Sequence, residues 1–182
     1  MELRGERLLA ADRATAWAAL NDTAMLKDCV PGCENITASG ENQFDIAMTA
    51  AVGPVKARFK GRLALVDIDE PNAYTMKFEV SGGPTGFARG EARVTLAEVS
   101  PTQTKLTYLA NAHVGGKLAQ VGSRLIDAAA KKLADEFFSA FNARVAPAAA
   151  EAAAPKPAAG VPIWVWIAAA IAAIVAVLFS IR

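Results

Sequence analysis

The chain has 182 residues, of which 53% are hydrophobic and 20% charged, and its formal net charge at pH 7 is +1. Leaving Arg182 out of the 19 Lys and Arg gives 18 against 18 Asp and Glu, so residues 1–160 are neutral overall. This balance argues against a nucleic-acid partner, which requires a clustered positive field, and against strong adhesion to anionic lipid. With two cysteines and no apolar stretch in the first residues, nothing indicates a secreted disulfide scaffold or a signal peptide, so we expect a cytoplasmic domain.

Residues 1–145 are expected to form one domain of the α+β class, beginning with a short strand at residues 1–10. Asp12 is a good N-cap for a short helix over residues 13–20. A second short helix is expected at residues 23–29, where Val30-Pro31-Gly32 ends it.

Apolar and polar residues then alternate with a period of two in five consecutive segments, separated by Gly-, Pro- and Asp-rich turns. This pattern predicts an antiparallel sheet with one apolar and one solvated face. The segments begin near Phe44, Val55, Tyr74, Ala88 and Leu106.

The period changes to that of a helix at residues 117–145, where apolar residues recur at spacings of three and four. Gly115-Gly116 marks the start of this expected amphipathic helix. A curved antiparallel sheet with one long C-terminal helix across its apolar face is a helix-grip arrangement.

Small residues at inward positions of the sheet favour an apolar cavity beneath the helix, although a solidly packed core is the alternative. We expect the first half of the helix to act as a lid hinged at Gly115-Gly116, and the second half to be a packed clamp that includes Leu133, Phe137 and Phe141. The expected ligand-cavity residues are Phe59, Met76, Phe78 and Tyr108 on one wall and Leu118, Val121 and Leu125 on the other.

Side chains that could carry chemistry are few, and we expect no catalytic residue and no metal site. Cys29 and Cys33, with the single histidine His113, cannot complete a four-ligand zinc site within one chain, and two small buried thiols are the simpler interpretation. His113 is expected on the solvated face of its strand. Gly115-Gly116-Lys117 could hold an anion at a helix start, but a plain turn is favoured.

The last part of the chain differs in composition from the domain. Residues 146–160 are Ala- and Pro-rich and are expected to be a linker, which spans at most about 50 Å when extended. Residues 161–181 contain no charge and, at about 1.5 Å per residue, are long enough to cross a bilayer. We expect them to form a transmembrane tail anchor with Trp164 and Trp166 at the membrane interface; the alternative, a buried core helix, should show a polar stripe.

Four motifs resemble the CoxG family, which takes its name from carbon monoxide dehydrogenase, and the likeness extends over residues 1 to about 143. The resemblance implies a START-like (SRPBCC) helix-grip domain. The motifs are the runs that start at Cys29 (CVPGCE), Gly53 (GPVKARFKG), Gly86 (GFARG) and Val114 (VGGKLAQVGSRLI).

The resemblance also implies an accessory protein without catalytic activity or a covalent cofactor. Members are thought to bring a molybdenum hydroxylase of the carbon monoxide dehydrogenase type to the membrane, where its electrons enter the quinone pool. Because START-like cavities commonly hold lipids or polyketides, the primary hypothesis is an adaptor, tethered to the inner membrane, whose cavity holds a quinone or lipid. The alternatives are a purely structural anchor with a solid core and, third, a START-like enzyme.

Overall fold

The computed structural model describes residues 1–153, and residues 1–151 form one compact unit. The expected transmembrane anchor at residues 161–181, with Trp164 and Trp166, lies outside the described residues, as does the end of the expected linker. Among the residues that are described, no helix is both long and apolar enough to cross a membrane.

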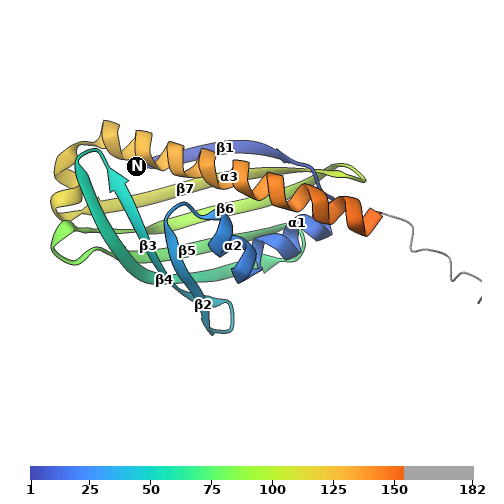
Figure 1. The fold of residues 1–182 in the computed structure, drawn as a ribbon, viewed down its shortest axis with the longest axis horizontal. Coiled ribbons are helices and arrows are strands. Elements are labelled where there is room, and N and C mark those ends of the chain that lie inside the picture. Colours follow the sequence, from blue (N-terminus) through green and yellow to red (C-terminus); the bar gives the residue numbers. More distant parts are fainter. Residues whose placement is uncertain (154–182) are drawn as a thin grey trace, which may run out of the picture. The chain divides into compact units, whose positions relative to one another are not determined.

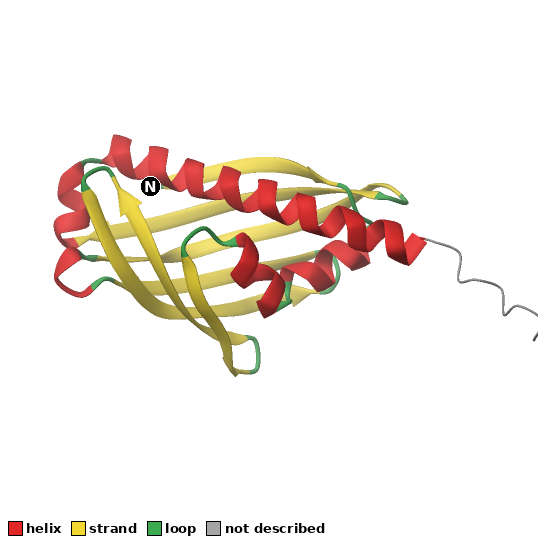
Figure 2. Cartoon of the chain, viewed as in Figure 1, coloured by secondary structure: helices red, strands yellow, loops and turns green. Residues whose placement is uncertain are grey.

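A seven-stranded antiparallel sheet and one long helix make up the α+β fold, as the alternation predicted (Figures 1 and 2). The strands lie in the order β1-β7-β6-β5-β4-β3-β2. Every neighbouring pair is antiparallel, so consecutive strands form a meander and β1 closes onto β7. The strands are β1 (Glu2–Leu9), β2 (Cys33–Gly40), β3 (Gln43–Val52), β4 (Val55–Asp69), β5 (Ala73–Ser81), β6 (Phe87–Ser100) and β7 (Gln103–Gly115).

The edge strand β2 was not predicted. Only Ile36 of its eight residues is buried, and its pairing with β3 shifts register twice, so it has almost no period-two signal. Pairing with β3, rather than an alternating pattern of its own, therefore makes this segment a strand.

The two short helices confirm the expected bounds, with α1 at Arg13–Leu20 and α2 at Thr23–Cys29. Each begins at an aspartate whose carboxylate accepts backbone N–H groups that lack helical partners. At Asp12, the hydrogen bonds from the Thr15 side chain and backbone lower the pKa of the carboxyl below its usual value. These caps fix the two helices at one end of the sheet.

The long helix α3 (Ser123–Ala153) begins later and ends later than the expected range of 117–145. Gly116 and Gly122 have φ of +74° and +93°, so residues between them form a 3-10 helix, η2 (Gly116–Val121), and the α-helix starts only after Gly122. At the other end, the Ala-rich sequence after Val145 continues the helix because alanine has the highest helix propensity.

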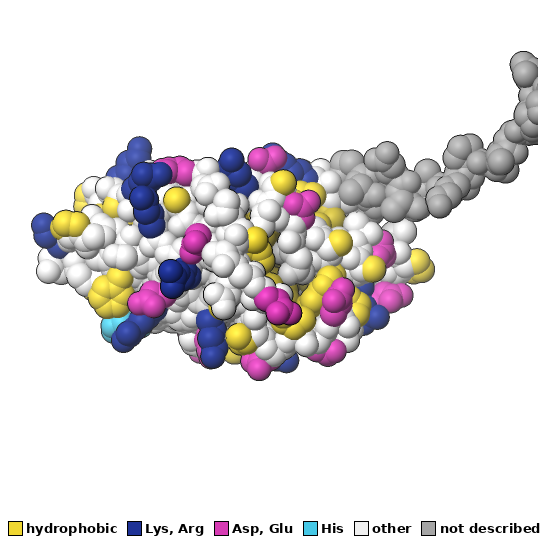
Figure 3. Space-filling model, turned by 90° about the horizontal axis from the view of Figure 1, so that it is seen from below, with side chains coloured by type: hydrophobic (Ala, Val, Ile, Leu, Met, Phe, Trp, Pro, Cys, Tyr) yellow, Lys and Arg dark blue, Asp and Glu magenta, His cyan; other side chains and the backbone are white. Residues whose placement is uncertain are grey.

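The sheet curves around α3, and two glycines permit the close approach of its strands. A Cβ at Gly61 would collide with the carbonyl oxygen of Glu79, and one at Gly90 with that of Asn111. The outward face of the sheet is charged and solvated; Figure 3 shows both basic and acidic side chains on the underside of the domain. The inward face is apolar, as the alternation requires.

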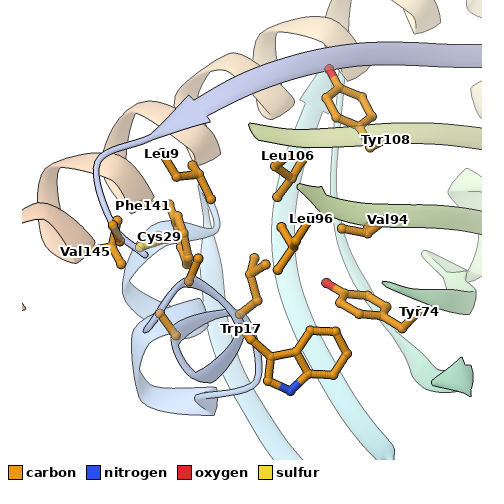
Figure 4. Close-up of a cluster of buried hydrophobic side chains, with 14 residues drawn as sticks. Leu9, Trp17, Cys29, Tyr74, Val94, Leu96, Leu106, Tyr108, Phe141 and Val145 are labelled. Atoms are coloured by element: carbon orange, nitrogen blue, oxygen red, sulfur yellow. The ribbon is translucent and has the colours of Figure 1, made fainter. Parts of the chain in front are cut away.

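The fully buried core lies at one end of the domain, where α1 and α2 fill the space between the sheet and the second half of α3 (Figure 4). Leu9, Leu106, Phe141 and Val145 are at most 1% exposed there. The hydroxyl of buried Thr104 donates to the carbonyl of Ala11 at 2.9 Å, which ties β7 to the segment that leads into α1. Phe141 is therefore part of a packed clamp, as expected.

We predict that Phe141→Ala lowers the free energy of unfolding by about 3–5 kcal/mol, because it leaves a cavity in a fully packed cluster. Leu125→Ala, on the same helix, should change it by about 0.5 kcal/mol or less because Leu125 is 46% exposed. Urea unfolding of both variants measures the difference, and equal losses would contradict this division of the helix.

Candidate ligand cavity

A cavity of about 360 Å³ lies between the sheet and α3, next to the packed end. This volume is near the lower limit of the roughly 300–1,000 Å³ typical of small-molecule sites. Its floor comes from alternate residues of four strands, which face inward because side chains along a strand point to opposite faces in turn. The floor residues are Leu63, Leu65, Tyr74, Met76, Ala92, Val94, Leu106 and Tyr108.

The roof of the cavity is one turn and a half of α3, from Leu133 to Phe138. Phe138 stacks on Tyr108 with a centroid distance of 5.3 Å, and Phe137 packs edge-on against Phe138 at 5.0 Å. Phe137 also stacks on Phe141 at 5.7 Å, so the roof is continuous with the packed core.

Arg7 of β1 holds this part of α3 against the edge of the sheet. Its guanidinium pairs with Asp135 and lies 5.5 Å from the ring centre of Phe138. The pKa of Asp135 is lowered, first by the hydrogen bond from Lys131 and then by the charge of Arg7. These contacts position Phe138 over the cavity.

The remaining wall belongs to α2, the turn after it, and the strands β2 and β3. Most of these apolar side chains are only half-buried, which indicates that the cavity is in contact with solvent on this side. The residues are Leu26, Val30, Pro31, Ile36, Phe44, Ile46 and Met48.

Three polar residues, Asn21, Tyr74 and Tyr108, line the cavity, and none of the lining residues is Asp, Glu, Lys, Arg or His. Burial raises the pKa of Tyr74 to about 12. The indole of Trp17 packs edge-on against the Tyr74 ring at 5.6 Å, and the side-chain amide of Asn21 donates to the Trp17 carbonyl at 2.9 Å. Tyr108 points toward β1 (Figure 4), where a Cβ at Gly5 would come within 2.6 Å of its hydroxyl oxygen.

Comparison with known families decides the relationship of this domain. The family model of CoxG, a component of carbon monoxide dehydrogenase, matches residues 5–146. The chain belongs to the CoxG family. No curated protein matches the sequence.

Solved structures place the CoxG domain in the START-like superfamily. A conserved protein from Geobacillus kaustophilus is 28% identical with a TM-score of 0.76, and the match covers 81% of this chain and 96% of that one. A START superfamily protein from Mycobacterium smegmatis is 13% identical with a TM-score of 0.62, over 79% and 96% of the two chains. The Zhui aromatase/cyclase from Streptomyces sp. R1128 is 12% identical with a TM-score of 0.61, over 80% and 93%. At these low identities the last two show the fold alone.

The cavity of this CoxG domain lies farther along α3 than the sequence suggested. Met76 and Tyr108 line it as expected, but the other five expected residues do not. Phe59 and Leu118 are buried near the turns at the opposite end, Phe78 and Val121 are half-buried, and Leu125 is exposed. Since α3 begins only at Ser123, the roof falls to Leu133 and Phe137, which were expected in the clamp.

Sequence reasoning missed Tyr74, Leu65 and Val94, although the same period-two parity that selects Met76 also points them inward. It also missed Phe138, because a helix face wide enough to cover a curved sheet includes residues beside the main apolar stripe. The wall from α2 and β2 had no sequence signal at all, since it forms only when these segments fold across the sheet.

The other candidate side chains stay apart from the cavity. Cys29 is buried and Cys33 half-buried, both are free, and burial raises the pKa of each thiol. His113 is exposed, with its ring 5.9 Å from that of Phe87. Within residues 1–153, no group of His, Cys, Asp and Glu has the arrangement to hold a metal ion.

Tyr74 provides a pH test of the cavity. We expect its phenol to ionise near pH 12 rather than near pH 10, and ultraviolet absorbance of phenolate measures this. Because the unfolded chain loses this proton at lower pH than the folded protein, stability falls as pH rises from 10 to 12, by about 2–3 kcal/mol. Tyr74→Phe should remove that part of the loss; an unchanged pH profile would contradict the buried phenol.

Ala92 provides a test of the empty volume. We expect Ala92→Phe to cost less than about 1 kcal/mol of stability, because the new ring enters the cavity. Ala16→Phe is the matched control: Ala16 is 0% exposed in the packed core, and the same enlargement there should cost about 1–3 kcal/mol or more. Thermal unfolding compares the two, and equal destabilisation would indicate that the site at Ala92 is solidly packed.

Proposed function

We propose that this protein is a membrane-tethered accessory protein that holds a quinone or a similar lipid in the cavity beneath α3. In this role it serves a molybdenum hydroxylase of the carbon monoxide dehydrogenase type at the inner membrane. The cavity itself is the observation that carries the proposal: it is lined by apolar side chains and three polar residues, without a charged group. Membership of the CoxG family, which is named for carbon monoxide dehydrogenase, supports the choice of partner.

The lining suits a flat ring with an isoprenoid tail. Such a ligand needs apolar area and one or two hydrogen bonds, and the hydroxyl groups of Tyr74 and Tyr108 are the available partners for its carbonyl oxygens. A volume of about 360 Å³ holds the ring and the first part of a tail. A longer tail would leave between α3 and β3, where Phe44 and Met48 are half-buried.

The two other functions receive less support. A purely structural anchor needs no cavity, whereas here many inward apolar side chains, such as Leu63, Leu65 and Met76, remain half-buried. An enzyme is the third candidate because one neighbour in fold is named an aromatase/cyclase. General acid–base chemistry near neutral pH requires a suitable acid and base, and the cavity offers only two phenols and one amide for it.

The tether is proposed from residues 161–181, which carry no charge. Ending the chain after Ala146 should release the domain from membranes washed at high salt, while the full chain stays bound. The linker, at most about 50 Å long when extended, would let the domain collect its ligand from the bilayer and turn toward a soluble enzyme.

Quinone binding by the full chain in mild detergent tests the proposal. We expect a short-chain ubiquinone to elute with the protein on gel filtration, detected by its ultraviolet absorbance, and Ala92→Phe to reduce the bound quinone at least tenfold. Ala97→Phe is the matched control, because Ala97 is exposed on the opposite face of the same strand and should leave binding unchanged. If the parent protein carries no quinone or lipid, the structural anchor becomes the better explanation.

A further inference from the structure

Three turns that are far apart in sequence meet at the end of the domain opposite the packed core (Figure 1). They are the β3–β4 turn, the 3-10 turn η1 (Gly83–Thr85) between β5 and β6, and η2 with the first turn of α3. Gly86 lies against the Gly115 carbonyl and Leu118, and Gly53 lies against the side chain of Leu125. We refer to residues 51–57, 82–90 and 113–126 together as the basic end.

The charges of the basic end all have one sign. Its three segments contain Lys56, Arg89, Lys117 and Arg124, together with His113, and no Asp or Glu. All five side chains are exposed. Within the described domain none of the four cations forms an ion pair, and Arg89 instead lies 5.9 Å from the ring centre of Phe87. In Figure 3 blue side chains and the histidine gather at this end.

The compensating negative charge lies elsewhere. The β4–β5 turn, at the other end of the sheet, carries Asp67, Asp69 and Glu70, and the caps Asp12 and Asp22 lie near it. The neutrality of residues 1–160 therefore results from segregated charges rather than from an evenly mixed surface. A net charge of zero does not prevent attraction of one end to an anionic surface, which corrects the argument drawn from the total charge.

Between its cations the basic end is uncharged and partly apolar. Pro54, Pro84, Ala119 and Leu125 are exposed, and Phe87, its only aromatic residue apart from His113, is half-buried. Cations spread over three turns with apolar residues between them match the interface of an anionic bilayer, where mobile headgroups can rearrange to meet each charge. A tight protein partner would instead require exposed aromatic or arginine anchors with matching pockets.

We propose that the basic end is a docking surface for a bilayer containing anionic phospholipid. Docking there orients the domain with its packed end away from the membrane and the first half of α3 at the headgroups. The charge pattern carries this inference without reference to the cavity ligand, so it stands or falls separately from quinone binding.

The test uses the full chain reconstituted in vesicles, with Cys33→Ser to remove the half-buried thiol and one new cysteine for an environment-sensitive fluorophore. Ala119→Cys places the label on η2 in the basic end, and Thr102→Cys places it on the exposed β6–β7 turn at the other end. The label at residue 119 should shift to the blue and resist a soluble quencher in phosphatidylcholine with 30% phosphatidylglycerol, but not in phosphatidylcholine alone. The label at residue 102 should be the same in both, and high salt should reverse the shift.

Charge-removing variants give the magnitude. Each Lys or Arg near an anionic surface raises the ratio of docked to free domain about fivefold, so Lys56→Gln with Lys117→Gln should lower it about 25-fold. Lys27→Gln with Lys105→Gln makes the same change in net charge at the other end and should have no effect. Equal effects of the two pairs, or the same emission at residue 119 in both lipid compositions, would overturn the proposal. So would loss of binding to an acidic partner protein in the Lys56/Lys117 variant without any lipid-dependent shift.

Discussion

One helix cannot fill the inside of a seven-stranded curved sheet. Seven strands spaced about 4.8 Å apart span roughly 30 Å, whereas a helix with its side chains is only about 10–12 Å across. The remaining space must be filled by other elements or stay open. In this domain α1 and α2 fill one end, where Phe141 and Val145 are completely buried, and the cavity occupies the space next to them.

The position of the cavity follows from how α3 is held. Its second half is fixed by the packed core and by Arg7, which pairs with Asp135 and lies over Phe138. Its first turn rests on the β3–β4 turn through Leu125 and Gly53. Between these supports the inward residues of the sheet are largely small or half-buried, so the helix bridges the sheet rather than packing closely along it.

This division separates the chemical roles of the domain. The packed end supplies stability, the middle supplies an apolar site with two phenols and one amide, and the far end presents unpaired cations to its surroundings. An apolar ligand site and a surface suited to anionic headgroups are complementary properties for a protein that exchanges material with a bilayer. Neither property requires a catalytic group, in agreement with membership of the CoxG family.

The sequence by itself determined the fold class, the bounds of α1 and α2, most strands, and the family, because these depend on local period, capping residues and contiguous motifs. It selected Met76 and Tyr108 for the cavity because strand parity decides which side chains face inward. Only the tertiary structure decided which inward residues enclose empty space: two glycines with positive φ delay the start of α3, and the roof moves to Leu133 and Phe137. Only the tertiary structure also decided where charge accumulates. Lys56, Arg89 and Lys117 are separated by about thirty residues each, and the meander of the sheet brings their turns to the same end.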